Sequence, residues 1–173
     1  MLPKLTLVLG GAASGKSAFA EALINRSGRS QTYFATAQIF DDEMHDKVSR
    51  HKVMRGGAWH TIEERLEVGP ALTRIDESQA VLLDCATMWL SNHLLAEKDM
   101  SQAESALFDG LAKCPAPVIV VSSEVGHSVV PENALARRFR QAQGELNQKL
   151  AAEAELVVNV IAGLPQVLKG TLP

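Results

Sequence analysis

The chain is 173 residues long and 46% of its residues are hydrophobic, which suffices for one sizeable core and leaves little room for a second domain. Its 17 Lys and Arg against 20 Asp and Glu give a formal net charge of −3, which argues against the basic surface that nucleic-acid binding requires. No apolar run reaches the ~18 residues of a membrane span, and the first residues lack a signal-peptide pattern, so we expect a cytoplasmic protein without membrane insertion.

The first part of the chain has the pattern of strand, helix, strand and helix. Residues 5–9 are apolar and a glycine pair follows them, which is typical of a buried strand. Apolar residues then recur at helical spacing over about 15–27. Residues 31–35 resemble a second strand, and two aspartates with N-cap chemistry predict a helix over about 41–54.

The second part continues the alternation of strands and helices. The pattern predicts strands at 80–84, 117–121 and 156–161, and helices at 86–97, 102–113 and about 131–155. Because strands and helices alternate from end to end, we expect one α/β domain over residues 1–173. Its sheet should be mostly parallel and covered by helices on both faces.

The junction between the first strand and the first helix reads GGAASGKS, which matches the phosphate-loop pattern G-x-x-x-x-G-K-[ST]. Glycines let successive backbone N–H groups turn inward around a phosphate, and the following helix adds its positive end. The alternative is a glycine-rich turn that binds nothing, which the position between a strand and a helix disfavours. The candidate nucleotide-binding residues are Gly10, Gly11, Ala12, Ala13, Ser14, Gly15, Lys16 and Ser17.

The same motif predicts a magnesium site. Lys16 can reach the β- and γ-phosphates, and the Ser17 hydroxyl can ligate Mg²⁺. Asp84 ends a predicted buried strand, which is where proteins of this class carry the acid that holds the metal. Its alternative is an ordinary N-cap for the helix that begins near residue 86.

Residues 41–55 carry two histidines among several charges. His51 could act as acid, base or nucleophile, with basic neighbours around a phosphate. The alternative is a solvated helix with i,i+4 charge pairs, which composition by itself favours.

The other polar and aromatic residues give weaker signals. We expect His45, His60, His93 and His127 to be surface or loop residues, and Trp59 and Trp89 to lie in the core. Glu124 follows a strand and could line the site or be a loop charge. Cys85 and Cys114 form no CxxC pair, which argues against a disulfide framework or a thiolate metal site.

Collected in order, these motifs resemble one family along nearly the whole chain. The matching segments are residues 10–17, 20–23, 35–44, 50–55, 59–63, 82–92, 124–126, 130–133, 135–137 and 144–148. The family is the bifunctional adenosylcobinamide kinase/adenosylcobinamide-phosphate guanylyltransferase of cobalamin nucleotide-loop assembly. The resemblance implies a RecA-like P-loop NTPase fold and assembly as a homotrimer whose sites are completed between subunits.

The resemblance also implies two reactions at one site. ATP or GTP phosphorylates adenosylcobinamide, and GTP then gives GMP to the product through a guanylyl-histidine that the family motif places on His51. Splitting the transfer in this way replaces one difficult displacement with two easier ones. Beyond the phosphate loop, the implied nucleotide-site residues are Ala35, Thr36, Ala37, Lys52, Val53, Met54, Arg55, Glu63 and Asp84.

The chain departs from the family pattern at a few positions. They are Ala13 in place of an arginine, Gly56 in place of a proline, Ser123 in place of an asparagine, Ser128 in place of a glycine and Gln141 in place of an aspartate. Two other functions fit the phosphate loop alone, namely a different small-molecule kinase and a nucleotide-dependent switch. A histidine-bound nucleotide formed from GTP would distinguish the bifunctional enzyme from both.

Overall fold

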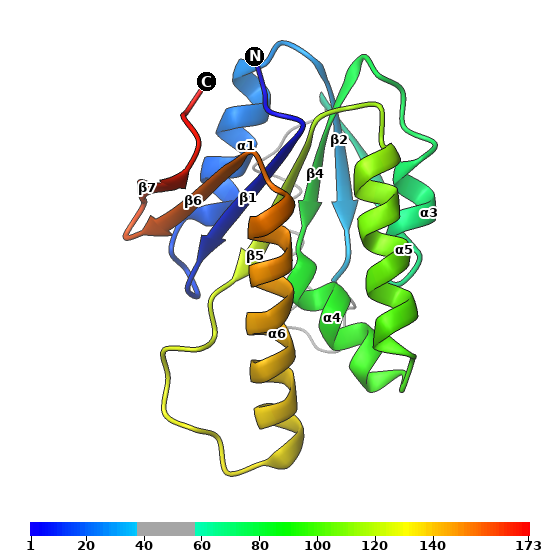
Figure 1. The fold of residues 1–173 in the computed structure, drawn as a ribbon. Coiled ribbons are helices and arrows are strands. Elements are labelled where there is room, and N and C mark those ends of the chain that lie inside the picture. Colours follow the sequence, from blue (N-terminus) through cyan, green and yellow to red (C-terminus); the bar gives the residue numbers. More distant parts are fainter. Residues whose placement is uncertain (38–57) are drawn as a thin grey trace.

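The computed structural model describes residues 1–37 and 58–173, so the helix expected over 41–54 lies outside the described residues. The described residues form one seven-stranded sheet flanked by helices (Figure 1). The strands are β1 Leu5–Gly10, β2 Ser30–Ala35, β3 Trp59–Glu63, β4 Gln79–Asp84, β5 Val118–Ser123, β6 Leu156–Ile161 and β7 Leu164–Lys169. The helices are α1 Lys16–Arg26, α3 Val68–Leu72, α4 Ala86–Leu95, α5 Met100–Lys113 and α6 Ala134–Glu153.

The strand order is β3-β2-β4-β5-β1-β6-β7, and every neighbouring pair is parallel except β6 and β7. The expected mostly parallel α/β sheet is therefore confirmed. The sheet has two strands that the sequence pattern does not predict. They are β3 and β7, the two edges, where strands are half-exposed or exposed and lack a long apolar run.

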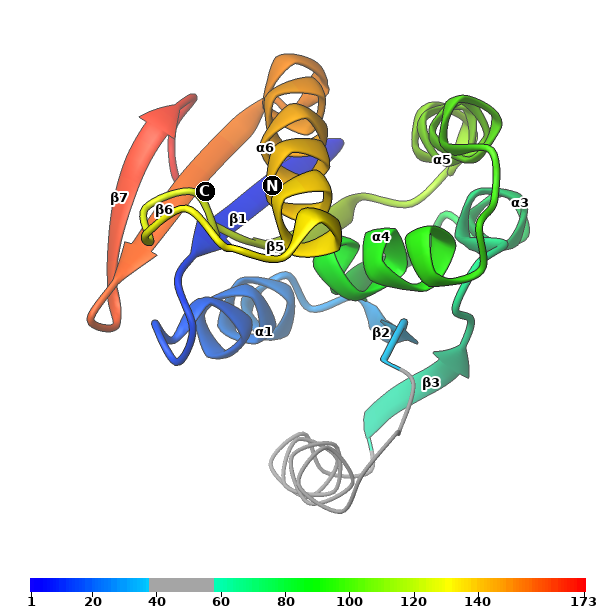
Figure 2. The same ribbon diagram turned by 90° about the horizontal axis from the view of Figure 1, so that it is seen from below.

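Side chains alternate between the two faces of the sheet, and each face is covered by different helices. Val8 and Leu82 point into a cluster with α1, whereas Leu7 and Leu83 point into a cluster with α3, α4, α5 and α6. Two views at right angles show α1 on one face and the other helices on the opposite face (Figures 1 and 2). The expected covering of both faces is thus confirmed.

Capping side chains shift two helix boundaries from their expected places. The Asp99 carboxylate accepts hydrogen bonds from the backbone N–H groups of Ser101 and Gln102, so α5 begins earlier than expected. The Asn133 side chain accepts from Ala136 N, so α6 begins after the Pro131-Glu132-Asn133 segment rather than at its start.

Helices α3 and α5 cross at two glycines with no room for a side chain. A Cβ added to Gly110 would overlap the backbone of Gly69, and one added to Gly69 would overlap that of Ala106. Gly110→Ala should therefore lower the free energy of unfolding by about 1–3 kcal/mol, although alanine is ordinarily the better helix former. Chemical denaturation measures the change.

Gly144 in α6 is the matched control for this prediction. A Cβ added there meets nothing within 4 Å. Gly144→Ala should raise the free energy of unfolding by roughly 0.5–1 kcal/mol through helix propensity alone. Two substitutions that change stability in the same direction would contradict the close approach of α3 and α5.

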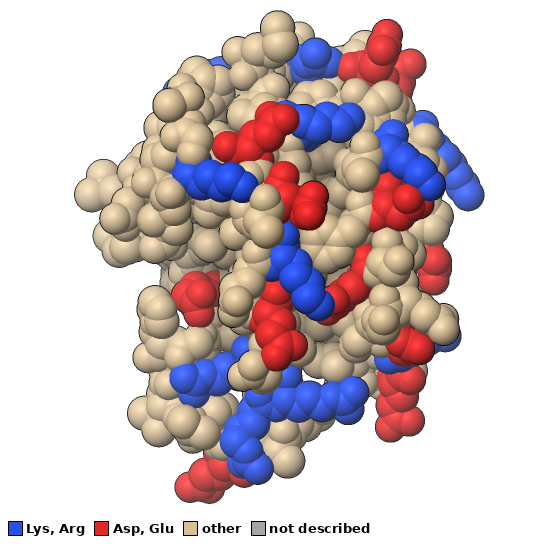
Figure 3. Space-filling view, viewed as in Figure 1, with Lys and Arg blue, Asp and Glu red and all other residues tan. Residues whose placement is uncertain are grey.

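Charged side chains of both signs are interspersed on the face that carries α6 (Figure 3). Basic side chains gather at the lower end of this view, over the amino-terminal half of α6, which contributes Arg137, Arg138 and Arg140. Among the helices described, none has the length and apolar character that crossing a lipid bilayer takes.

Candidate functional site

The described candidate site residues lie at or near the carboxyl ends of the parallel strands. Figure 2 views the sheet from this side. Ala35 at the end of β2 lies opposite Glu63 on one side and opposite Asp84 on the other. On the far side of β5, Gly10 ends β1 and leads into the phosphate loop. Open parallel sheets bind ligands at this edge, because loops and helix amino termini meet there.

The phosphate loop runs directly from β1 into α1, as its motif predicts. Gly15 stands at the N-cap of α1 with φ of 91°, a left-handed conformation that favours glycine. The Lys16 ammonium donates to Gly11 O at 2.9 Å and so lies back across the loop. Ser17 occupies the first turn of α1, at the positive end of the helix dipole. This arrangement suits an anion with several phosphate oxygens.

Asp84 is held by a hydrogen bond rather than used as a helix cap. The Tyr33 hydroxyl donates to Asp84 Oδ2 at 3.0 Å. Cys85, not Asp84, is the N-cap residue of α4, and no side chain caps that helix. The N-cap alternative for Asp84 is therefore wrong, and its half-buried carboxylate is oriented at the sheet edge by a neighbouring strand.

The oxygens at this edge fit a magnesium ion. Ser17 offers a hydroxyl and Asp84 a carboxylate, which are the hard donors that Mg²⁺ prefers. Across residues 1–37 and 58–173 there is no group of three or more His, Cys, Asp or Glu residues that could hold a metal. A sparse donor set suits Mg²⁺ in nucleotide sites, where substrate phosphates and water complete the coordination.

Thr36, an expected nucleotide-site residue, makes hydrogen bonds with Cys85 and Asn92. Its hydroxyl donates to Cys85 O at 2.8 Å and accepts from Cys85 N at 2.7 Å. The side chain of Asn92 donates to Thr36 O at 2.8 Å and to Arg65 O at 3.2 Å. Thr36 therefore joins the ends of β2 and β4, and Asn92 ties this junction to α4.

The environment of Cys85 disfavours its thiol as a nucleophile. Burial raises the pKa of Cys85 to about 11, and the neighbouring Asp84 carboxylate adds to the rise. The thiolate is the reactive form of cysteine, so a covalent step at this edge needs another residue. Cys85 and Cys114 are both free thiols.

The loop after β5 packs against the end of β1. Glu124 N donates to Gly10 O at 3.0 Å, and the Glu124 carboxylate accepts from Gly126 N at 2.6 Å. The Arg140 side chain donates to Gly126 O from α6. Glu124 thus lies beside the phosphate loop, and its carboxylate stabilises the turn of its own loop.

The remaining residues singled out in the sequence differ in whether the structure describes them and in how exposed they are. His51, Lys52, Val53, Met54 and Arg55 lie outside the described residues, as does His45. His60 and His127 are exposed, as expected, and Trp89 is buried in the core, whereas Trp59 is only half-buried.

The expectation that His93 is a surface residue is wrong. Its side chain is only 4% exposed, its Nε2 lies 3.1 Å from Leu66 O, and its ring packs on Trp89. Helix α4 places His93 toward the core, and its contact with Leu66, which lies in the segment before α3, could not be predicted from local sequence.

Two functional contacts have weak sequence signals. Tyr33, the only tyrosine of the chain, has no motif around it, yet it orients Asp84. Gly163 lies in a Gly-containing turn after the last predicted strand, which is a signal for a hairpin, and it contacts the phosphate loop.

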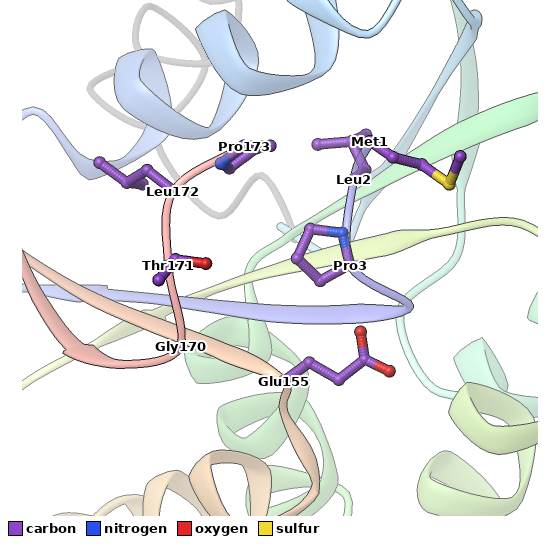
Figure 4. Close-up of a pocket in the computed structure, with 8 residues that line it drawn as sticks. All are labelled: Met1, Leu2, Pro3, Glu155, Gly170, Thr171, Leu172 and Pro173. Carbon is purple, nitrogen blue, oxygen red and sulfur yellow. The ribbon is translucent and has the colours of Figure 1, made fainter.

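Two hollows lie on the surface of the described residues. One is formed by both chain ends together with Glu155 (Figure 4). Glu155 precedes β6, so this hollow lies at the opposite end of the strands from Gly10. The other is an apolar groove between α4 and α6. A phosphate loop needs no enclosed pocket, because its ligand groups are backbone amides at an open edge.

Comparison with known proteins gives a family match over most of the chain. The matching family is described as "Cobinamide kinase / cobinamide phosphate guanyltransferase", and it covers residues 6–168. The bifunctional adenosylcobalamin biosynthesis protein CobP of Pseudomonas aeruginosa is 40% identical over 167 residues, which are 95% of this chain and 96% of that protein. Its counterpart CobU of Escherichia coli is 39% identical over 181 residues, covering 95% of this chain and 99% of the relative.

Solved structures show the fold at much lower sequence identity. The flagellar accessory protein FlaH of Methanocaldococcus jannaschii aligns with a TM-score of 0.55 and 14% identity, over 99% of this chain and 80% of that one. An ATPase of a bacterial type III secretion system aligns with a TM-score of 0.62 and 12% identity, over 91% of this chain and 52% of that one. These neighbours confirm the expected P-loop NTPase fold.

Proposed function

The chain belongs to the cobinamide kinase/cobinamide phosphate guanyltransferase family of bifunctional enzymes, and we propose that it phosphorylates adenosylcobinamide and then converts the product to adenosylcobinamide-GDP. The observation that carries this proposal is the family match over residues 6–168, with a phosphate loop at the carboxyl edge of the sheet. Function is argued from that site and its motifs, because the fold alone hosts many activities. No observation favours the plain kinase or the switch over this function.

In the kinase step, the phosphate loop holds the triphosphate of ATP or GTP. The substrate hydroxyl oxygen bonds to the γ-phosphorus and releases its proton to solvent. The bond from that phosphorus to the bridging oxygen breaks, and a nucleoside diphosphate leaves. Lys16 and the loop amides offset the charge on the phosphate oxygens as it moves. We assign Glu63, Ala35, Thr36 and Ala37 to the nucleotide site from the family motif. The strand register that sets Ala35 beside Glu63 and Asp84 supports this assignment.

In the guanylyl step, a nitrogen of His51 bonds to the α-phosphorus of GTP and pyrophosphate leaves. An oxygen of the phosphorylated cobinamide then bonds to that phosphorus, and the phosphorus–nitrogen bond breaks to free the histidine. Lys52 and Arg55 help to offset the developing charge, and Val53 and Met54 complete the segment beside the nucleotide. All five residues lie outside the described part of the chain, so this step rests on the sequence and the family.

We assign the metal to the oxygens of Ser17 and Asp84. A bound Mg²⁺ supplies positive charge that neutralises phosphate oxygens and orients the triphosphate. Asp84, whose carboxylate Tyr33 orients, would hold the ion in place.

A homotrimer and a cytoplasmic location are also part of the proposal. Analytical ultracentrifugation at several protein concentrations tests the trimer.

The two reactions can be tested directly. The purified chain, supplied with adenosylcobinamide, Mg²⁺ and ATP or GTP, should form the phosphate, and with GTP it should form adenosylcobinamide-GDP and pyrophosphate. Chromatography with mass detection follows both products. A folded protein that binds GTP and forms neither product would refute the proposed function.

Tyr33→Phe tests the assignment of Asp84 to the metal. The variant removes the hydroxyl that donates to Asp84 Oδ2 and keeps the aromatic ring, which packs edge-on against Trp59 at 6.2 Å between centroids. The Mg²⁺ concentration for half-maximal kinase activity should rise about tenfold, as expected when a group that orients a metal ligand is lost. A magnesium titration at saturating nucleotide measures this shift.

The control for this variant is thermal stability. The melting temperature of Tyr33→Phe should stay close to that of the native chain, since its ring remains in place. An unchanged magnesium requirement in this variant would contradict the metal role of Asp84.

A further inference from the structure

The turn between β6 and β7 lies against the phosphate loop. Gly163 N donates a hydrogen bond to Ser14 O at 2.8 Å. A Cβ added to Gly15 would lie 3.2 Å from Gly163 Cα, and one added to Gly10 would lie 2.7 Å from Val160 O. The turn therefore touches the phosphate loop at Ser14 and Gly15, while at the other end of the loop Gly10 pairs with Val160 within the sheet.

The conformation of this turn is specific. Ile161 pairs with Leu164, so the two strands are joined by a two-residue loop. Ala162 and Gly163 have φ of 51° and 79°, the positive values of a type I′ hairpin turn. A turn of this type is compact, and it holds the Gly163 N–H at a fixed place beside Ser14.

The hydrogen bond to Ser14 O has a consequence for the next residue. Ser14 O and Gly15 N belong to one planar trans peptide, in which C=O and N–H point in opposite directions. The contact with Gly163 therefore also fixes the direction of the Gly15 N–H. Within residues 1–37 and 58–173, that N–H donates to no other backbone group. It is one of the amides that a phosphate loop turns toward its ligand.

Strand β7 contributes little to the core, in contrast to β6. All six residues of β7 are exposed, and none belongs to either buried cluster. The turn that leads into β7 contacts the phosphate loop, whose backbone conformation is demanding.

We propose that Gly163 is a positioning residue for nucleotide binding, acting through the Ser14–Gly15 peptide to hold the phosphate loop in its binding conformation. The inference rests on the proposed function only in that the loop binds a nucleoside triphosphate. Gly163 itself touches no reacting atom, so its loss should raise the KM for GTP more than it lowers kcat.

The test compares two valine variants at positive φ. Gly163 and Gly28 have φ of 79° and 70°, and a Cβ at either one meets nothing within 4 Å. Gly163→Val and Gly28→Val thus introduce the same backbone strain, but Gly28 lies between α1 and β2, at the other end of α1 from the phosphate loop. Binding of the α,β-methylene analogue of GTP, which cannot release pyrophosphate, is measured by calorimetry with Mg²⁺.

We expect Gly163→Val to bind the analogue on the order of tenfold more weakly, the effect of losing one hydrogen bond to a charged group. Gly28→Val should bind like the native chain, although both variants melt at lower temperature. Gly163→Asn should bind within about twofold of the native chain, because asparagine tolerates positive φ and keeps the N–H.

A further Gly163 variant separates the hydrogen bond from backbone strain. Glycolic acid in place of Gly163, introduced by semisynthesis of the carboxyl-terminal segment, replaces the donating N–H by an ester oxygen and adds no side chain. The same loss of affinity is expected. Native affinity in Gly163→Val or in the glycolic acid variant, or an equal loss in Gly28→Val, would overturn the inference while leaving the proposed function intact. Failure of the native chain to bind the analogue would instead overturn the proposed function.

Discussion

Replacing Lys16 with alanine is expected to lower kcat/KM at least a hundredfold for both the kinase and the guanylyltransferase reactions. Lys16 is the one side-chain cation of the phosphate-loop motif, and its ammonium already lies across the loop on Gly11 O. Both reactions need the triphosphate held, and loss of one charge-stabilising donor commonly costs 10²–10³ in rate. Steady-state rates with each substrate pair, measured at several GTP concentrations, test the expectation.

The matched control is Lys113→Ala. Lys113 lies on α5 and pairs with Asp109 at 2.8 Å, with both side chains more than half exposed. An exposed pair of this kind is worth little, so both activities should be unchanged. A folded Lys16→Ala protein that keeps native GTP turnover would show that the phosphate-loop assignment is mistaken.

The strands that follow from hydrophobic periodicity are those buried between helices. Residues 80–84 and 156–161 are short apolar runs because both faces of β4 and β6 are covered, and this burial is visible in the sequence. Strand β7 has Pro165 near its start and is exposed along its length, so it carries no such signal. The five-residue helix α3 contains Gly69 and Pro70, which argue against a helix in any local analysis.

Parts of the candidate site can be predicted from short segments of the sequence, and other parts depend on contacts between distant segments. The phosphate loop is a contiguous motif whose residue spacing indicates phosphate binding, and it lies where the pattern predicts. The Asp84 position at a strand end is also local. Its contact with Tyr33 depends instead on β2 lying beside β4, and strand order is not written in periodicity. The contact of Gly163 with Ser14 likewise needs β6 beside β1.

The burial of His93 also could not be predicted from local sequence. Its neighbours on α4 are predominantly apolar, and an isolated histidine there can face solvent or the core equally well. The contact with Leu66 O favours the buried position. Leu66 O accepts a hydrogen bond from Trp89 Nε1 at 3.0 Å and lies 3.1 Å from His93 Nε2. That carbonyl comes from a loop distant in sequence, so only the tertiary structure reveals the contact.

His51→Ala is expected to separate the two activities. If the guanylyl group is carried on His51, the variant should lose GMP transfer by at least about a thousandfold, because removal of a covalent nucleophile leaves only the binding contributions. It should retain kinase activity, since phosphorylation of the cobinamide hydroxyl passes through no histidine adduct. Intact-protein mass spectrometry after incubation with GTP and Mg²⁺ should show an acid-labile GMP adduct on the native chain and none on the variant.

His60→Ala is the control for this experiment. His60 is an exposed histidine on β3, in the strand that ends at Glu63, and its loss should leave the adduct and both activities in place. Burial raises the pKa of Cys85 to about 11, which disfavours this thiol as an alternative acceptor at neutral pH. An adduct that persists in His51→Ala, or an equal loss of both activities in a folded variant, would remove His51 from the covalent step. A native chain that binds GTP and forms no adduct would instead favour a plain kinase mechanism.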